Sequence, residues 1–470
     1  MLLELPGKAA DLAAALAEDP PAGFLDAVPG ARTLLVLFDP DRFDPASLDR
    51  TAAARRTAPR TVRLAARYDG PDVESLARET GIAPGELARL HSAAEYTVAF
   101  LGFAPGFAYM TGTPPPFAVP RLKTPRVRVP AGSLAVADGY TGIYPAETPG
   151  GWRLIGRVAV RLFDPRASPP ALLRPGDRVV FESVEDLGEA PSASPAPAVR
   201  DPVARVVSPG PFTTVQGSPR YGLSASGVPA GGAMDLASLA AANALAGNAP
   251  FAAALEITIA GPELEFVAPA RIAIEGSARD VRSGERVKVG AVRRGARAYL
   301  AVDGGLAQPL PGEPTRPLRR GEELARASAP PASTMRPPPM PDRLGGSFTV
   351  RAVPGPQTNY FAEPEAFFAT EYRLSPDSDR RGLRLQGPPL AMARPADLPP
   401  EGTAPGAVQV PGNGMPIVLG PDRPVTGGYA KIATVISADL PLLAQARPGA
   451  TIRFRAVDLA EALAARKGRT

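Results

Sequence analysis

The 470-residue sequence contains no cysteine and a single histidine, His91. The absence of thiols excludes a disulfide framework and any thiolate metal site. A lone histidine excludes the H-E-x-x-H helix of metalloproteases, and His91 lies outside the local patterns of a Ser-His-Asp triad or a histidine-rich zinc site. Apolar runs are also short, because none reaches the roughly 18–20 residues that a transmembrane helix needs. We therefore expect a soluble, cytoplasmic protein without a metal site of these kinds and without a membrane partner.

Lysine is scarce as well, since only five of the 52 basic residues are lysine. The Walker A pattern is absent, because Gly7-Lys8 is followed by Ala9 rather than by a serine or threonine that could hold magnesium. If the protein uses ATP, it does so without a P-loop. The formal net charge is +5, but acidic and basic residues are interspersed without a block of like charges. We expect no nucleic-acid partner.

Glycine and proline are abundant, and in residues 95–157 they alternate with aromatic residues. Glycine permits close backbone approach and positive φ, whereas proline fixes φ and removes a donor. The combination predicts rigid turns that frame a pocket. These turns are Gly102-Phe103, Pro105-Gly106-Phe107, Val129-Pro130-Ala131-Gly132, Thr141-Gly142-Ile143-Tyr144-Pro145 and Pro149-Gly150-Gly151-Trp152. A shorter set of similar turns occurs near the end of the chain, at Val410-Pro411-Gly412 and Thr426-Gly427-Gly428-Tyr429. The repetition predicts a duplicated domain architecture.

The chain divides at two segments rich in proline, residues 188–200 and 327–346. Residues 1–90 have the alternating pattern of an α/β N-terminal domain, and many short strands separated by turns follow. A helix is predicted at residues 235–246, with Asp235 as its N-cap and Gly247 as its stop. The predicted fold is mainly β with an α/β N-terminal domain, and the expected folded units are residues 1–90, 91–187, 201–326 and 347–460.

Two families resemble the two parts of the chain. Residues 1–185 resemble the B subunit of 5-oxoprolinase through His91, Tyr96-Thr97-Val98, residues 102–109, Thr124-Pro125-Arg126, the turns at 129–132, 141–145 and 149–152, and residues 154–157. Residues 204–456 resemble the C subunit of the same enzyme, the biotin-dependent carboxyltransferase-like family. This second resemblance rests on Thr214-Val215-Gln216, residues 232–235, Asn243, residues 255–258, 375–380 and 406–411, and the segment 426–434.

The resemblance implies cyclophilin-like β-barrels, one in the B-like half and two in the C-like half. It also implies a fusion of two partners, with an intramolecular B–C interface. The implied activity is ATP-dependent opening of 5-oxoproline to glutamate, in which the B/C pair phosphorylates the lactam and the separate A subunit of 5-oxoprolinase completes the reaction. ATP with Mg²⁺ is the implied cofactor, and biotin is not expected on this chain. The alternatives are a carboxyltransferase acting on urea or a related amide, and a regulatory protein without catalysis.

The first C-like unit departs from the family pattern. Residues 217–221 replace a longer turn, Gly231 replaces a serine, and residues 308–316 stand where a Gly-Ser-Arg-Ser-Thr loop is expected. In the last unit, Ala430 replaces a proline. These departures put the chemistry or the substrate of the first C-like unit in doubt.

Phosphoryl transfer needs positioned cations and N–H donors, because negative charge spreads over the phosphoryl oxygens. The candidate catalytic residues are Arg126, Lys431, Asp379 and His91. The candidate substrate- and nucleotide-binding residues are Phe103, Gly106, Phe107, Tyr109, Lys123, Arg128, Pro130, Ala131, Gly132, Thr141, Tyr144, Gly150, Gly151, Gln409, Asp422, Thr426, Gly427, Gly428 and Tyr429.

Each candidate also has a structural interpretation. The glycines fit plain turns, and Arg126 and Arg128 fit a solvated strand face. His91 fits a helix C-terminus or an interdomain hydrogen bond better than a general base, and Trp152 fits barrel packing.

Overall fold

The computed structural model describes residues 1–51, 59–122, 124–195, 200–327 and 346–467, so Lys123 lies outside the described residues. The N-terminal unit is a small antiparallel sheet in the order β1-β3-β2, covered by α1. Its elements are β1 (Leu2–Glu4), α1 (Ala9–Glu18), β2 (Phe24–Pro29) and β3 (Thr33–Phe38). This confirms the expected α/β start of the chain.

The B-like half is built on a closed seven-stranded barrel in the order β11-β4-β12-β5-β6-β9-β8. Its strands are β4 (Thr61–Arg67), β5 (Glu95–Leu101), β6 (Ala108–Thr111), β8 (Ser133–Ala137), β9 (Tyr140–Ile143), β11 (Arg153–Val158) and β12 (Arg178–Ser183). Helices α2 (Val73–Thr80) and α3 (Pro84–Ser92) follow β4, and a separate ribbon pairs β7 (Arg126–Val129) with β10 (Thr148–Gly150). Because β4 pairs with both β11 and β12, the barrel begins well before residue 91.

The first C-like unit consists of two facing sheets with a shared apolar core. One has the order β19-β16-β13-β21, and the other β14-β15-β20-β17-β18. No strand ladder between described residues joins the two sheets. The prediction of a barrel in this unit is therefore wrong, because the two sheets do not close into one. Its elements are β13 (Pro202–Ser208), β14 (Phe212–Gln216), α4 (Leu236–Ala246), β15 (Ala254–Thr258), β16 (Glu263–Phe266), β17 (Ala270–Ile274), β18 (Ser277–Val281), β19 (Arg286–Lys288), β20 (Arg297–Val302) and β21 (Glu323–Ala325).

Helix α4 has the ends that the sequence predicts. The Asp235 carboxylate accepts a hydrogen bond from Ser238 N at 3.0 Å, and Gly247 ends the helix with φ 81°. The helix packs its alanines and Leu239 against the outer face of the five-stranded sheet.

The last unit is a second closed barrel, in which β22 completes the ring by pairing with β28 and β29. Its elements are β22 (Ser347–Pro354), α5 (Glu365–Ala369), β23 (Glu371–Leu374), β24 (Gly382–Gln386), β25 (Asp397–Gly402), β26 (Ala407–Val410), β27 (Ile417–Leu419), β28 (Thr426–Val435), α6 (Leu440–Ala444), β29 (Thr451–Ala456) and α7 (Leu459–Lys467). No helix in the described part of the chain is both long and apolar enough to cross a membrane.

The two closed barrels have the same topology. In each, the first strand pairs in parallel with the last strand, as β4 does with β12 and β22 does with β29. Continuing around the rings, β5, β6, β9, β8 and β11 correspond to β23, β24, β27, β26 and β28. The duplication predicted from the turns is therefore present. The turns themselves are not equivalent, because Thr141 lies on β9 whereas Thr426 begins β28.

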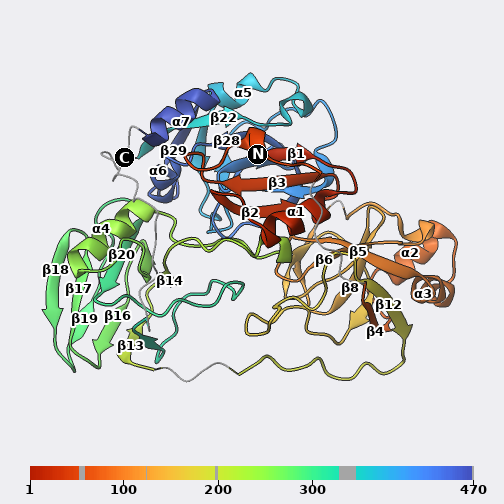
Figure 1. Cartoon of the computed structure of the whole chain (residues 1–470), viewed down its shortest axis with the longest axis horizontal. Coiled ribbons are helices and arrows are strands. Elements are labelled where there is room, and N and C mark those ends of the chain that lie inside the picture. Colours follow the sequence, from red (N-terminus) through yellow and green to blue (C-terminus); the bar gives the residue numbers. More distant parts are fainter. Residues whose placement is uncertain (52–58, 123, 196–199, 328–345, 468–470) are drawn as a thin grey trace.

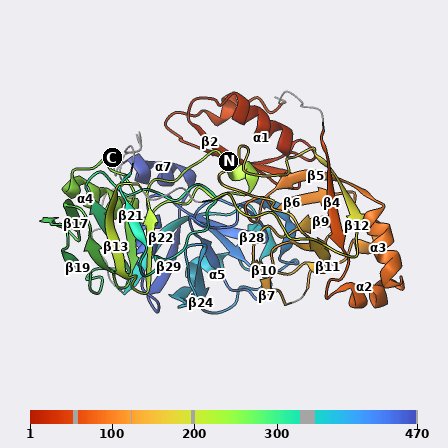
Figure 2. The ribbon, with the colours of Figure 1, turned by 90° about the horizontal axis from the view of Figure 1, so that it is seen from below.

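The second barrel lies between the other two units, with the B-like barrel on one side and the two-sheet unit on the other (Figures 1 and 2). The N-terminal sheet lies against this second barrel, where Val28 and Leu35 pack on Val425. Ala31 N donates to Pro400 O at 2.7 Å across this contact. The two halves of the chain are thus joined by the N-terminal sheet as well as by their barrels.

Candidate active site between the two barrels

The outer face of the B-like barrel carries an aromatic cluster. Along β6 the side chains alternate, so that Ala108 and Met110 fill the barrel while Tyr109 points to the outer face. Tyr109 stacks on Phe100 with ring centres 4.5 Å apart. The other members of this cluster are Phe103, Phe107, Tyr140, Tyr144 and Trp152.

The glycines of the turns are needed because the aromatic rings are close to the backbone. A Cβ on Gly142 would lie 2.9 Å from Phe107 Cζ, and one on Gly150 would lie 2.2 Å from the Tyr144 hydroxyl. The Gly132 N–H donates to Tyr144 O at 2.8 Å and the Gly106 N–H donates to Ser226 O at 2.9 Å. These two N–H groups hold the fold together and are not free to bind phosphate.

This aromatic face meets the first residues of β28. Phe103 N donates to Thr426 Oγ1 at 2.7 Å, and a Cβ on Gly102 would lie 2.2 Å from the same oxygen. Phe103 adopts a positive φ of 62°, a conformation that costs a non-glycine residue free energy. Arg121 reaches from the B-like half to the backbone at Gly428, while its Nε donates to Asp138 at 2.9 Å. Turns from both halves therefore form one interface.

Next to this interface lies a buried polar cluster around Lys431. Lys431 is 4% exposed and forms an ion pair with Glu401, whose Oε1 also accepts from Gln357 Nε2 at 2.8 Å. Lys431 N donates to Gln357 Oε1 at 3.1 Å. Burial lowers the pKa of Lys431, although the Glu401 carboxylate acts in the opposite direction. A buried ammonium that is paired with a carboxylate and has a lowered pKa suits proton transfer.

Gln409 connects this cluster to the glycines of β28. Its strand, β26, pairs with β28 so that Gln409 lies opposite Lys431. Its side-chain nitrogen donates to Tyr429 O at 3.5 Å, and a Cβ on Gly427 would lie 2.5 Å from that nitrogen. The structure thus brings together these candidates from the two halves: Phe103, Tyr109, Gln409, Thr426, Gly427, Gly428, Tyr429 and Lys431.

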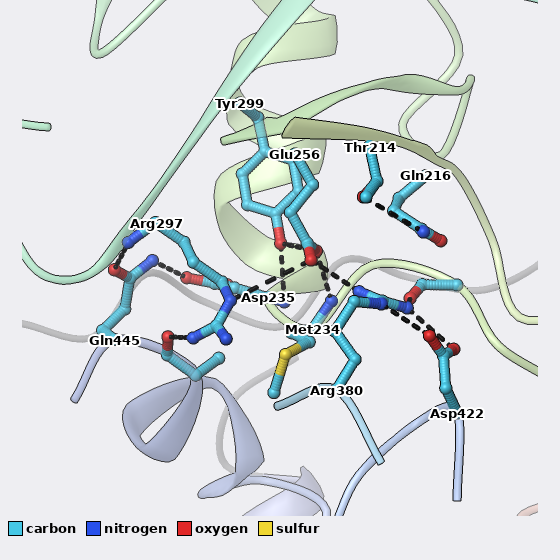
Figure 3. A network of polar contacts seen from close by, with 12 residues as sticks. Thr214, Gln216, Met234, Asp235, Glu256, Arg297, Tyr299, Arg380, Asp422 and Gln445 are labelled. Carbon is cyan, nitrogen blue, oxygen red and sulfur yellow. Dashed lines mark hydrogen bonds and ion pairs between the residues drawn. The ribbon is translucent and has the colours of Figure 1, made fainter. Parts of the chain in front are cut away.

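A second buried network joins the two-sheet unit to the last barrel (Figure 3). Arg380 donates to Glu256 Oε1 at 2.5 Å, to Gly232 O at 2.7 Å and to both oxygens of Asp422 at 2.8 and 3.0 Å. Burial alone would raise the pKa of Glu256, but the charges of Arg380 and Arg297 hold it below its usual value. Asp422 is therefore engaged by an arginine of its own chain and is not placed to bind magnesium.

His91 lies inside the B-like barrel rather than at the interface. It is fully buried among the rings of Tyr68, Tyr96, Phe117 and Phe181. Its Nδ1 lies 2.9 Å from the Tyr68 hydroxyl, and its Nε2 lies 3.3 Å from Thr141 Oγ1. Burial lowers the pKa of His91 to about 3. The geometry supports a neutral structural histidine, and it places Thr141 in that core too.

The other charged candidates are engaged in local pairs. Arg126 donates to Asp72 Oδ1 at 2.6 Å, and Arg128 forms an exposed pair with Glu147 at 2.6 Å. Arg126 is thus part of a partly buried pair, in which its own side chain is 28% exposed. Asp379 accepts from the N–H groups of Arg381 and Gly382 within its own turn. Among the described residues, no three acidic or histidine side chains gather closely enough to hold a metal ion.

Several residues of the interface were not selected from the sequence. Glu401, Gln357 and Arg121 lie outside the motifs. The pairing of β25 with β28 brings Glu401 to Lys431, and the pairing of β22 with β28 brings Gln357, which follows β22. Glu256 and Arg380 lie within the family motifs at residues 255–258 and 375–380. A charged residue in the middle of the apolar strand β15 is the signal that could have identified Glu256.

Comparison with known proteins agrees with this division of the chain. The family described as carboxyltransferase domain, subdomain C and D, matches residues 3–173, and subdomain A and B matches residues 226–456. The C subunit of 5-oxoprolinase from Escherichia coli (strain K12) is 36% identical over 293 residues, which cover 56% of this chain and 94% of that protein. The B subunit of 5-oxoprolinase from Bacillus subtilis (strain 168) is 35% identical over 195 residues, which cover 37% of this chain and 81% of that protein.

A solved structure extends the similarity to the whole chain. The crystal structure of TTHA0988 superposes with a TM-score of 0.84 at 35% identity, covering 97% of this chain and 99% of that one. The chain therefore belongs to the carboxyltransferase-domain family, and it joins in one polypeptide the two parts that are homologous to the B and C subunits of 5-oxoprolinase.

Proposed function

We propose that this protein is the fused B/C component of an ATP-dependent 5-oxoprolinase. It would bind 5-oxoproline, activate the lactam by phosphorylation and, with the separate A subunit of that enzyme, open the ring to glutamate. The observation that carries the proposal is the meeting of the two halves at Phe103 and Thr426, beside the buried Lys431–Glu401 pair. Both relatives described above are 5-oxoprolinase subunits, which favours a lactam over urea as substrate.

The interface offers groups suited to a small polar ring. Phosphorylation of the lactam oxygen makes the carbonyl carbon attackable, and protons must move as the ring nitrogen becomes an amine. Lys431 and Glu401 are the groups placed to hold and exchange a proton, and Gln409 and the Phe103 backbone place polar atoms near the same strand. The aromatic face around Tyr109 supplies an apolar wall.

The fit to ATP and Mg²⁺ is incomplete. Three of the cations expected to clamp phosphate are paired with a carboxylate, namely Arg126 with Asp72, Arg128 with Glu147 and Lys431 with Glu401. The fourth, Lys123, lies outside the described residues. The described part of the chain also lacks a carboxylate cluster for magnesium. We therefore derive no phosphoryl-transfer step through the nucleotide, and ATP remains part of the proposal.

The decisive experiment is ATP turnover with 5-oxoproline, measured with and without the A subunit. We expect 5-oxoproline-dependent release of phosphate and, with the A subunit, formation of glutamate. Lys431→Arg keeps the charge but changes its geometry, and it should reduce turnover by about tenfold or more. Lys288→Arg makes the same change at an exposed position on β19 and serves as the control. If the unaltered protein shows no 5-oxoproline-dependent turnover with the A subunit present, the proposal fails, and carboxyl transfer or regulation takes its place.

A further inference from the structure

Arg423 is a buried arginine with two unused donor groups. It lies in the turn between β27 and β28 and is 1% exposed. Its Nε donates to Thr403 O at 2.9 Å, but neither Nη1 nor Nη2 has a hydrogen-bond partner. Four other described arginines have a buried nitrogen without a hydrogen-bond partner, and in each of them this nitrogen is Nε. They are Arg153, Arg166, Arg220 and Arg297.

The nearby carboxylates do not satisfy this guanidinium. The negative charges of Asp26 and Asp422 stabilise the protonated form of Arg423 and so raise its pKa. However, Asp26 accepts from Ala27 N, Gly222 N and Ser224, and Asp422 is held by Arg380 through both oxygens. Burial lowers the pKa of Arg423 to about 10, so the group stays protonated at neutral pH. Its charge is partly offset, while its terminal N–H groups remain without acceptors.

Arg423 lies where several parts of the molecule converge. Asp26 comes from the N-terminal sheet, and Tyr221, a neutral phenol whose pKa is coupled to the charge of Arg423, comes from the two-sheet unit. The segment 217–232 that contains Tyr221 includes two of the departures from the family pattern, at residues 217–221 and at Gly231. It is held in place by Asp26 and by the hydrogen bond from Gly106 N to Ser226 O.

Leaving a buried charged donor unpaired is costly, and native proteins rarely do so. A guanidinium with both terminal nitrogens free matches a carboxylate or phosphate, because its planar fork can donate two parallel hydrogen bonds to two oxygens. We propose that Arg423 forms a binding site for a small oxyanion at this junction, with Nη1 and Nη2 as the donors. The inference does not depend on the 5-oxoprolinase activity, because anion binding is measured without turnover.

The test measures thermal unfolding of the full chain against increasing inorganic phosphate, acetate or 5-oxoproline at constant ionic strength. A ligand that binds only the folded state raises Tm by mass action. We expect a saturable rise of at least about 2 °C with phosphate, with a carboxylate or with both, and the ligand that saturates at the lowest concentration identifies the source of the oxyanion.

Two variants and a control decide whether Arg423 is responsible. Arg423→Met should abolish the rise without lowering the Tm of the ligand-free protein, because it replaces a buried charge whose terminal N–H groups are unpaired with an apolar side chain. Arg63→Met removes the same charge from an exposed position outside the candidate sites and should respond like the unaltered protein. If Arg423→Met fails to fold, Arg423→Lys keeps the charge without the fork and should weaken anion binding by about tenfold or more. The proposal is overturned if the unaltered protein shows no anion-dependent rise, or if the Arg423 variants retain it.

Discussion

At the scale of single residues, the buried cations differ in how completely their N–H groups are paired with acceptors. Arg380 is satisfied by two carboxylates and a carbonyl, and Lys431 by one carboxylate. Breaking such a pair leaves a buried charge alone, which costs more than the pair itself contributes. Arg423 is in that unfavourable situation already, and this distinguishes a candidate binding group from a structural one.

His91 gives a prediction about pH, because the chain has no other histidine. Burial lowers its folded pKa to about 3, whereas an unfolded histidine has a pKa near 6.5. Below about pH 6.5 the unfolded state binds a proton that the folded state does not, so stability is lost as the pH falls. Between pH 7 and pH 5 this residue should remove about 2 kcal/mol.

Urea unfolding at several pH values measures this effect, with His91→Gln as the comparison. The variant should have a flatter stability profile between pH 5 and 7, whatever its absolute stability. The buried N-terminal amine also has a lowered pKa, but it is common to both proteins and cancels in the difference. Parallel profiles for the two proteins would show that the pKa of His91 is the same in the folded and unfolded states.

Arg126 and Arg128 give a matched pair of stability measurements. The Asp72 side chain is 8% exposed and accepts from Arg126 and from Leu154 N, whereas both partners of the Arg128–Glu147 pair are at least half exposed. Arg126→Ala should therefore lower the free energy of unfolding by about 1–3 kcal/mol. Arg128→Ala should change it by less than about 0.5 kcal/mol. Equal effects in denaturant titrations would contradict the burial of the Asp72 pair.

Contact between the barrels gives a prediction at the scale of elements. A Cβ on Gly102 would lie 2.2 Å from Thr426 Oγ1, so Gly102→Ala should push β28 away from the turn before β6 and destabilise the protein by about 1–3 kcal/mol. Adding Thr426→Ala should recover part of the loss, which a double-mutant cycle measures. Gly85→Ala is the control, because it lies in α3 with open space around it and should be neutral or slightly stabilising. A Gly102 variant as stable as the Gly85 variant would show that the contact yields without cost.

Some elements could be predicted from the sequence because their signals are local. Helix α4 begins at an aspartate cap and ends at a glycine, and both signals lie within the helix or next to it. Ion pairs are different, since Arg126 and Asp72 are 54 positions apart and Arg380 and Glu256 are 124 apart. Only the closed barrels and their packing decide which partner an arginine finds. For the same reason, the sequence motifs locate turns that meet at the interface, but not the carboxylates that pair with Arg126, Arg128 and Lys431.

The whole molecule is arranged around the second barrel, which contacts every other unit (Figures 1 and 2). The two halves also contact one another away from this barrel, where Arg166 pairs with Glu313 at 2.5 Å. The connecting segment at residues 188–200 is not a free tether along its first part, because Ser194 donates to Asp164 at 2.6 Å. The relative placement of the halves is therefore supported by contacts spread over several surfaces.

Cutting the connecting segment tests whether these contacts hold the halves together without the covalent link. A 13-residue segment spans at most about 45 Å and keeps its ends at high effective concentration, so a weak interface would separate once it is cut. A protease site introduced at residues 196–199 makes the cut possible. We expect the fragments to elute together from gel filtration at micromolar concentration, because Val28 and Leu35 remain packed on Val425 and Phe103 remains bonded to Thr426.

In the Gly102→Ala variant the cut fragments should dissociate more readily, since that substitution acts only on the contact between the halves. Separation of the unaltered fragments under these conditions would mean that the covalent fusion, and not the interface, holds the two barrels side by side.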